Sequence, residues 1–246
     1  MSGEVVVKVS WGPRPETPLQ LAQRWLELLT GLSELSESSE GAPAEWRWEE
    51  DSGPGQLVPV ESEDFAAALE AANTQDDRDI LGYTANVVAT QPDGAYQRAR
   101  VIAGGSNEYS PFTAVVHLFP ASGCTAVPLT GRFTEVLALL ADVWDADHGL
   151  TYDRPLYNEL RSAYGLRASH PRAGWAVYLS ESRAARVPDG FSALRRLPGR
   201  HGGVVLEIAD SSGGTPSTQT VLAAHKTLAG TGALDPLPVP ATEAKL

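Results

Sequence analysis

Near the start of the chain, the hydrophobic positions change from a period of two to a period near 3.6. Residues 4–11 carry valines and a tryptophan at alternate positions, which is typical of a β-strand with one buried face. Thr17, Pro18 and Gln20 then give the start signal of a helix, a capping box with proline at the first helical position. Leucines and Trp25 recur at helical spacing as far as Leu32. The pattern predicts a strand followed by an amphipathic helix.

The middle of the chain has the alternation of an antiparallel meander. Residues 83–90, 96–103 and 112–119 are rich in β-formers, and the first two segments flank a Gln-Pro-Asp-Gly turn at 91–94. Upstream, residues 44–51 alternate tryptophan with charged residues and predict another strand. A short helix is expected to follow, capped by Ser62 and with Phe65, Leu69 and Ala72 on one face.

Helical and strand patterns also mix in the second half. Helices are expected at 133–144, 155–164 and 216–229, and strands at 174–180 and 203–209. Without regular βαβ alternation, this mixture predicts an α+β fold, a mostly antiparallel sheet covered by helices. We expect a single domain over 1–235, with a flexible acidic loop at 34–43. The Pro-rich C-terminal tail, 236–246, is expected to be extended or frayed.

The negative charge is concentrated in one segment. The formal net charge is −12, and the residues from Glu34 to Asp79 include 14 Asp or Glu against only two Arg, so this segment alone accounts for −12. A local negative field disfavours nucleic acid and membrane surfaces and speeds encounter with a basic partner. The alternative is a solvated acidic loop that serves only solubility, because charge runs are usually solvated.

Composition points to a reducing compartment. With Cys124 as its one cysteine, the chain forms no internal disulfide and no thiolate zinc site. The sequence shows no secretory signal and no apolar run of bilayer-spanning length. We therefore expect a cytoplasmic protein.

Candidate chemistry is sparse. Asp142, Asp145, Asp147 and His148, near residue 153, carry oxygen and imidazole groups suited to a divalent cation. The first two fall on the polar face of a predicted helix, and no established metal-binding spacing is present. The glycines form no phosphate-binding loop, and there is no Gly-x-Ser-x-Gly elbow. We expect no catalytic residue, no metal and no cofactor, and hence no enzyme; a metal-dependent hydrolase built on residues 142–148 is the alternative.

Several short motifs resemble the immunity protein family 52 of bacterial polymorphic toxin systems. They are the Trp-Gly-Pro-Arg-Pro-Glu segment after the first strand, the Val-Trp-Asp end of the 133–144 helix, and the Gly-Trp-Ala-Val-Tyr-Leu-Ser strand; the residues that carry the likeness are Trp11, Gly12, Arg14, Trp144 and Trp175. The resemblance implies an α+β domain that binds and inactivates one cognate toxin without catalysis. Toxins encoded beside members of this family are often predicted nucleases, which would be basic partners.

Charge and resemblance together predict where a toxin would bind. A basic nuclease cleft attracts carboxylates, and a tryptophan is a suitable aromatic anchor. The predicted contact residues are Glu45, Trp46, Trp48, Glu49, Glu50, Asp76, Asp77 and Asp79. A non-catalytic scaffold protein is a third possibility, and the sequence leaves the oligomeric state open.

Overall fold

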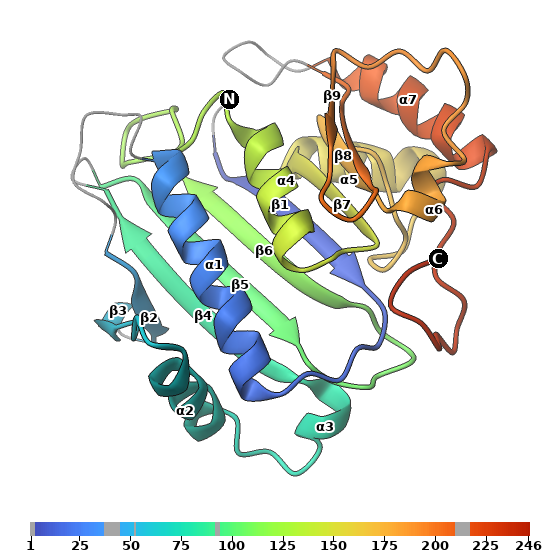
Figure 1. Cartoon of the computed structure of the whole chain (residues 1–246). Coiled ribbons are helices and arrows are strands. Elements are labelled where there is room, and N and C mark those ends of the chain that lie inside the picture. Colours follow the sequence, from blue (N-terminus) through green and yellow to red (C-terminus); the bar gives the residue numbers. More distant parts are fainter. Residues whose placement is uncertain (1–2, 37–44, 52, 92–93, 210–216) are drawn as a thin grey trace.

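Ten antiparallel strands form one continuous sheet in the computed structural model, which describes residues 3–36, 45–51, 53–91, 94–209 and 217–246 (Figure 1). The order across the sheet is β3-β2-β4-β5-β6-β1-β7-β8-β10-β9. The strands are β1 (Val5–Trp11), β2 (Arg47–Glu50), β3 (Gly53–Leu57), β4 (Tyr83–Thr90), β5 (Tyr96–Ala103), β6 (Phe112–Phe119), β7 (His148–Asp153), β8 (Ala176–Leu179), β9 (Arg195–Pro198) and β10 (Val204–Glu207). One sheet with helices packed on it confirms the predicted α+β class.

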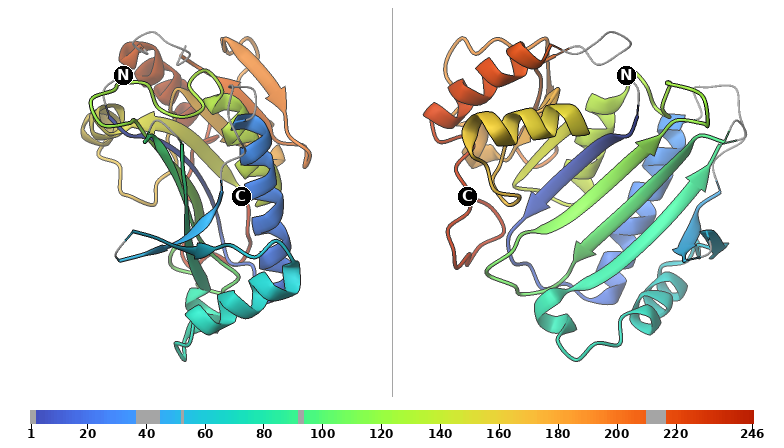
Figure 2. Two further views of the ribbon diagram at one scale, coloured as in Figure 1. Left: turned by 90° about the vertical axis from the view of Figure 1, so that its left-hand side faces the viewer. Right: turned by 180° about the vertical axis from the view of Figure 1, so that it is seen from behind.

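Helices lie on both faces of the sheet. Helices α1, α2 and α4 lie on one face, whereas α5 and α7 lie on the other face at the β7–β10 end (Figure 2). That second face is left open over β4, β5 and β6, as far as the described residues show (Figure 2). The helices are α1 (Pro18–Ser36), α2 (Ser62–Ala72), α3 (Arg78–Leu81), α4 (Phe133–Val143), α5 (Arg154–Tyr164), α6 (Glu181–Ala184) and α7 (Thr218–Gly230).

The strongest sequence patterns fold as predicted. Strands β4, β5 and β6 have the expected bounds, and Gln91 and Ala95 close the reversal between the first two by a backbone hydrogen bond of 2.7 Å. The capping box is formed, since the Thr17 amide donates to Gln20 Oε1 at 2.9 Å and the Gln20 amide donates to Thr17 Oγ1 at 3.3 Å. Helix α1 packs against α2 and α4, and its apolar stripe buries six residues: Leu21, Ala22, Trp25, Leu28, Leu29 and Leu32.

Several boundaries differ from the predictions. The predicted loop begins too early, because residues 34–36 form the last turn of α1, where Ser36 Oγ donates to the Leu32 carbonyl at 2.8 Å; residues 37–43 lie outside the described ones. Ser62 is the first residue of α2, and Glu61 occupies the cap position. Strand β7 went unpredicted although it pairs with both β1 and β8 in the middle of the sheet.

The Pro-rich tail is extended and docked, which is the first of the two expected states, extended rather than frayed. The Gly12 amide donates to the Ala244 carbonyl at 2.8 Å, and the Ala241 amide donates to the Glu108 carbonyl at 2.7 Å. Gly12 is required at this contact because a Cβ there would collide with the Glu243 carbonyl. Backbone hydrogen bonds of this kind hold in place a segment whose own sequence predicts no regular structure.

Among the described residues, no helix combines the length and apolar character needed to cross a membrane.

Two buried histidines make the stability depend on pH. Burial lowers the pKa of His225 from 6.5 to about 4, and burial together with nearby Arg183 lowers the pKa of His148 well below 6.5. Both rings therefore bind protons more readily in the unfolded chain. The free energy of unfolding is expected to fall as the pH drops from about 6.5 towards 4. Above pH 6.5 both histidines are neutral in the folded and unfolded chain, so their protonation costs no stability there.

Replacing His225 by glutamine is expected to flatten this fall by up to about 1.4 kcal/mol per pH unit. The measurement is urea unfolding of both proteins at pH 7, 6 and 5. A variant with the same slope as the wild-type protein would show that His225 is not the titrating group.

Candidate functional site

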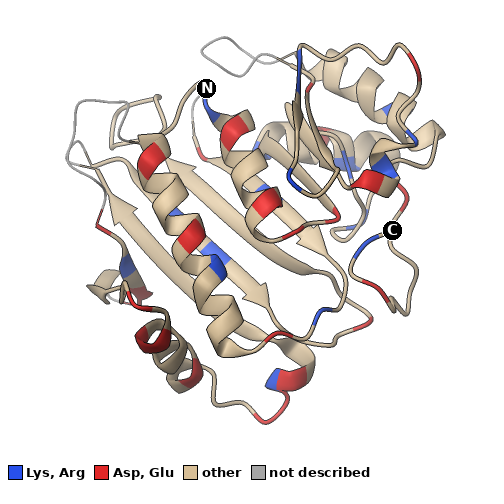
Figure 3. Ribbon diagram, viewed as in Figure 1, with Lys and Arg blue, Asp and Glu red and all other residues tan. Residues whose placement is uncertain are grey.

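Seven exposed carboxylates lie together in sequence on and around α2 and α3, and we call them the acidic surface (Figure 3). Arg78 is the one basic residue between them, and its guanidinium lies 6.0 Å from the centre of the Tyr83 ring. Within the described part of the chain, none of the seven takes part in an ion pair. The acidic surface consists of Glu61, Glu63, Asp64, Glu70, Asp76, Asp77 and Asp79.

The packing of α2 explains why these side chains face solvent. Helix α2 turns Phe65, Ala66 and Leu69 into the core, against α1 and β4, so its acidic positions point outward. Glu63 and Asp64 lie in its first turn, where negative charge is favoured by the helix dipole. The surface is therefore a consequence of how the apolar face of α2 docks.

Apolar side chains lie beside the carboxylates of α3. This one-turn helix has no buried residue, and Ile80 and Leu81 are 53% and 44% exposed. At the start of α2, Val60 is 81% exposed. Apolar groups within a charged rim are typical of protein-binding surfaces. Sequence reasoning missed them because an Ile-Leu pair normally indicates core.

The predicted contact residues differ in exposure and in whether they already form ion pairs. Asp76, Asp77 and Asp79 are exposed on the acidic surface, and Glu50 is exposed on β2. Two other carboxylates already have cationic partners: Glu45 lies 3.1 Å from Arg47, and Glu49 accepts from Arg98 Nε at 2.8 Å. These pairs reduce the charge that β2 offers to another molecule.

Trp46 lies just before β2 and Trp48 lies within it, and both pack on the core, so the buried Trp46 is not a free aromatic anchor. Trp46 is 8% exposed, and its Nε1 donates to Ser33 Oγ at 3.2 Å. Trp48 packs on Phe65, with 5.1 Å between the ring centres. Their hydrophobic area is used to hold the β2–β3 hairpin to α1 and α2, which corrects the anchor prediction.

Three of the residues behind the family resemblance, Trp11, Arg14 and Trp144, form a structural cluster at the end of α4. Trp11 and Trp144 stack with ring centres 5.5 Å apart, and the Arg14 guanidinium lies 5.2 Å from the Trp11 ring. Arg14 donates to the carbonyls of Trp144 at 2.8 Å and Asp145 at 3.3 Å, and so satisfies acceptors at the helix C-terminus. Trp175 lies elsewhere in the core, against Phe133.

The three aspartates of the alternative metal site each bind a different basic residue. Asp147 is buried and pairs with Arg183, Asp142 accepts the Arg200 amide at 2.9 Å, and Asp145 binds Lys245. The His148 ring is bonded to the Arg172 carbonyl at 2.9 Å. Among the described residues there is no group of three His, Cys, Asp or Glu that could hold a metal ion.

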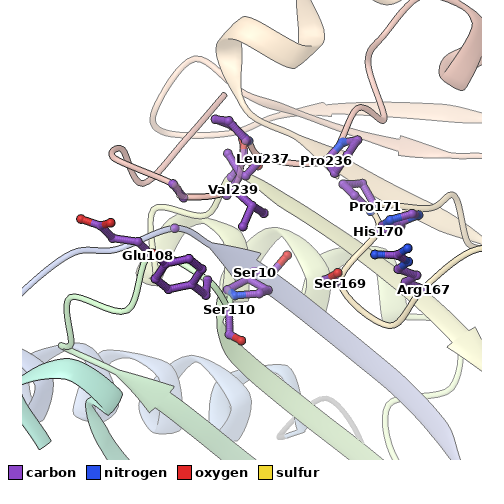
Figure 4. A pocket seen from close by; sticks show the side chains of 16 residues that line it. Ser10, Glu108, Ser110, Arg167, Ser169, His170, Pro171, Pro236, Leu237 and Val239 are labelled. Carbon is purple, nitrogen blue, oxygen red and sulfur yellow. The ribbon is translucent and has the colours of Figure 1, made fainter. Parts of the chain in front are cut away.

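A cavity of about 400 Å³ lies where the C-terminal tail meets the sheet (Figure 4). The β5–β6 loop contributes Glu108 and Tyr109, the segment before β8 contributes Arg167 and His170, and the tail contributes a wall of Pro236, Leu237 and Val239. No local sequence pattern predicts this cavity, because its walls come from segments that are distant in the chain.

Comparison with known proteins identifies a similar fold but no family. The Pseudomonas aeruginosa T6SS protein PA0821 is similar with a TM-score of 0.51 and 14% identity, over 94% of this chain and 77% of that one. No family model matches the chain, and no curated protein matches it. The likeness shows a shared fold, and membership of immunity protein family 52 stays a proposal.

Proposed function

We propose that this protein is a cytoplasmic immunity protein that neutralises a cognate toxin by stoichiometric binding, without catalysis of its own. The observation that carries the proposal is the acidic surface, whose seven exposed carboxylates lack ion pairs in the described structure; the exposed Ile80 and Leu81 directly follow Asp79 in the chain. A protein partner with a basic surface would neutralise the charge and cover the apolar pair.

The similar fold of a T6SS protein supports the proposal of a link to a toxin system. The similar Pseudomonas aeruginosa protein is described as a T6SS protein, and we extend that link to the toxin of the present chain. A nuclease is a suitable candidate, because a cleft that binds phosphate is basic and therefore complementary to the acidic surface. Carboxylates placed in such a cleft would occupy the positions of the phosphates.

The function is tested by co-expression with the toxin encoded by the neighbouring gene. We expect cells that carry both genes to survive, and a complex of the two proteins to purify with fixed stoichiometry. Death of cells that contain abundant folded protein would contradict the proposal. A catalytically inactive toxin variant serves as the control for toxicity.

Two other functions make different predictions. A metal-dependent hydrolase built on Asp142, Asp145, Asp147 and His148 would bind Mg²⁺, Mn²⁺ or Zn²⁺ in calorimetry and lose turnover in Asp145→Ala. The separate use of these side chains by Arg183, Arg200 and Lys245 favours the binding function. A scaffold protein would self-associate in light scattering and leave cells unprotected from the toxin.

A further inference from the structure

Two cations meet beneath the cavity at the C-terminal tail, on the face of the sheet opposite α1. Lys8 comes from β1 and Arg172 from the segment before β8, and both line a small recess of about 20 Å³. The strand register places Lys8 beside Leu150, in line with Ser10 beside His148, so these side chains share one face. No Asp or Glu is among the residues that line the recess.

Arg172 is buried with an unused donor. Its side chain belongs to a residue only 2% exposed, and the guanidinium lies 4.2 Å from the centre of the Tyr157 ring. Nε donates to the His170 carbonyl at 3.4 Å and Nη2 donates to the Arg167 carbonyl. Nη1 has no hydrogen-bond partner in the described structure. A buried donor without an acceptor costs about 1–3 kcal/mol, more when charged, so an acceptor at this point would be strongly favoured.

Lys8 is also without a partner, since no hydrogen bond or ion pair joins its ammonium group to another described residue. Burial and the nearby Arg172 guanidinium lower the pKa of Lys8. The neighbouring titratable groups do not offset this positive charge. Burial lowers the pKa of His148 and raises that of Tyr152 to about 12, so both are neutral near pH 7.

The recess opens beside the larger cavity, because five residues line both: Ser10, Pro111, Ser169, His170 and Pro171. The outer cavity of about 400 Å³ falls within the size range of small-molecule sites, and Tyr109, Leu237 and Val239 give it apolar walls (Figure 4). The outer cavity thus combines an apolar wall with the polar side chains of Glu108, Asp147 and Arg167, and it adjoins a recess with two cations and no carboxylate. This is the layout of a site for an amphiphilic anion.

We propose that this pocket binds a small organic anion, whose carboxylate or phosphate group lies between Lys8 and Arg172 and whose apolar body fills the outer cavity. The bound anion would accept from Arg172 Nη1 and pair with the Lys8 ammonium. Charge-assisted hydrogen bonds of this kind are the strong ones. The inference does not depend on the proposed function, and it adds a ligand site distant in sequence from the acidic surface.

Calorimetric titration of the isolated protein tests the ligand class. The probes are octanoate and octyl phosphate, which differ in the anionic head, with neutral octanamide and inorganic phosphate as partial ligands. We expect at least one amphiphilic anion to bind with a Kd below about 1 mM, and both partial ligands to bind at least about tenfold more weakly. The tighter of the two anions identifies the preferred head group. Absence of binding by both, or equal binding of octanamide or of inorganic phosphate, would overturn the proposal.

Substitution of Lys8 by methionine tests the site. Lys8→Met keeps an unbranched side chain of similar length and removes the charge. We therefore expect anion binding to be at least about tenfold weaker, with an unchanged or higher Tm. Arg172→Gln should weaken binding similarly. The matched control is Arg100→Met, since Arg100 is an exposed cation on the same face of the sheet but outside the pocket; it should bind as the wild-type protein does. Wild-type affinity in a folded Lys8→Met protein would place any bound anion elsewhere.

Discussion

Reversing three charges of the acidic surface, Asp76→Lys, Asp77→Lys and Asp79→Lys, is expected to weaken toxin binding by about 100-fold or more. The three carboxylates are exposed, and no ion pair neutralises them in the described part of the protein. Electrostatic steering by such charges changes association rates by about 10- to 1,000-fold, and like charges juxtaposed in an interface cost several kcal/mol. Most of the loss should therefore appear in the association rate at low salt.

Surface plasmon resonance at 50 and 300 mM salt measures this effect. A matched control reverses Glu159, Glu181 and Asp189, which are exposed and distant in sequence from the acidic surface, and so changes the net charge equally. We expect the control to bind within about threefold of the wild-type protein. Equal losses in both triple variants would assign the effect to net charge. Wild-type binding by the first triple variant would place the interface on another surface.

Replacing Asp147 by alanine is expected to destabilise the fold by about 3–5 kcal/mol, the cost of leaving a buried charge uncompensated. Its carboxylate receives Arg183 Nε at 2.8 Å and Nη2 at 2.7 Å, and the Arg183 side chain is fully buried. Arg183 also donates to the carbonyls of Ala233 and Asp235 at 2.9 and 2.8 Å. The pair thus joins the start of β7 to the residues that follow α7, and its loss should lower the Tm by about 10 °C.

Urea unfolding at pH 7 measures this change. The double variant Asp147→Leu with Arg183→Met removes both charges and should recover much of the lost stability, because hydrophobic replacement of a buried ion pair is often neutral. A loss below about 1 kcal/mol in Asp147→Ala would mean that Arg183 is compensated by other groups.

The parts of the fold that the sequence predicts are those set by local signals. The meander β4–β5–β6 follows from alternation and a tight turn, and α1 follows from a capping box and a regular apolar stripe. Strand β7 has no such signal, since its sequence mixes His, Gly, Thr and Asp, and it is buried because β1 and β8 flank it. Gly149 illustrates the point: a Cβ there would lie within 3 Å of side chains from β1 and α4, a constraint that arises only after folding.

In the candidate sites, too, the sequence predicts the features that need no tertiary partner and misses those that depend on one. Charge counting located Asp76, Asp77 and Asp79, because exposed carboxylates need no tertiary partner. It could not foresee that Glu49 pairs with Arg98, 49 residues away, or that Asp147 pairs with Arg183, 36 residues away. It also treated Lys8 as an ordinary polar position of a strand, although the docked segments 165–175 and 236–241 bury that face.

We propose that this protein inactivates its partner by binding to it stoichiometrically. The most direct measurement is a titration of purified toxin activity with purified protein, at a toxin concentration well above the Kd. The account predicts a linear decrease that reaches zero at a fixed ratio near one, with activity restored when the complex is dissociated and separated. Inactivation by a small fraction of an equivalent, or a toxin left permanently altered after separation, would contradict it.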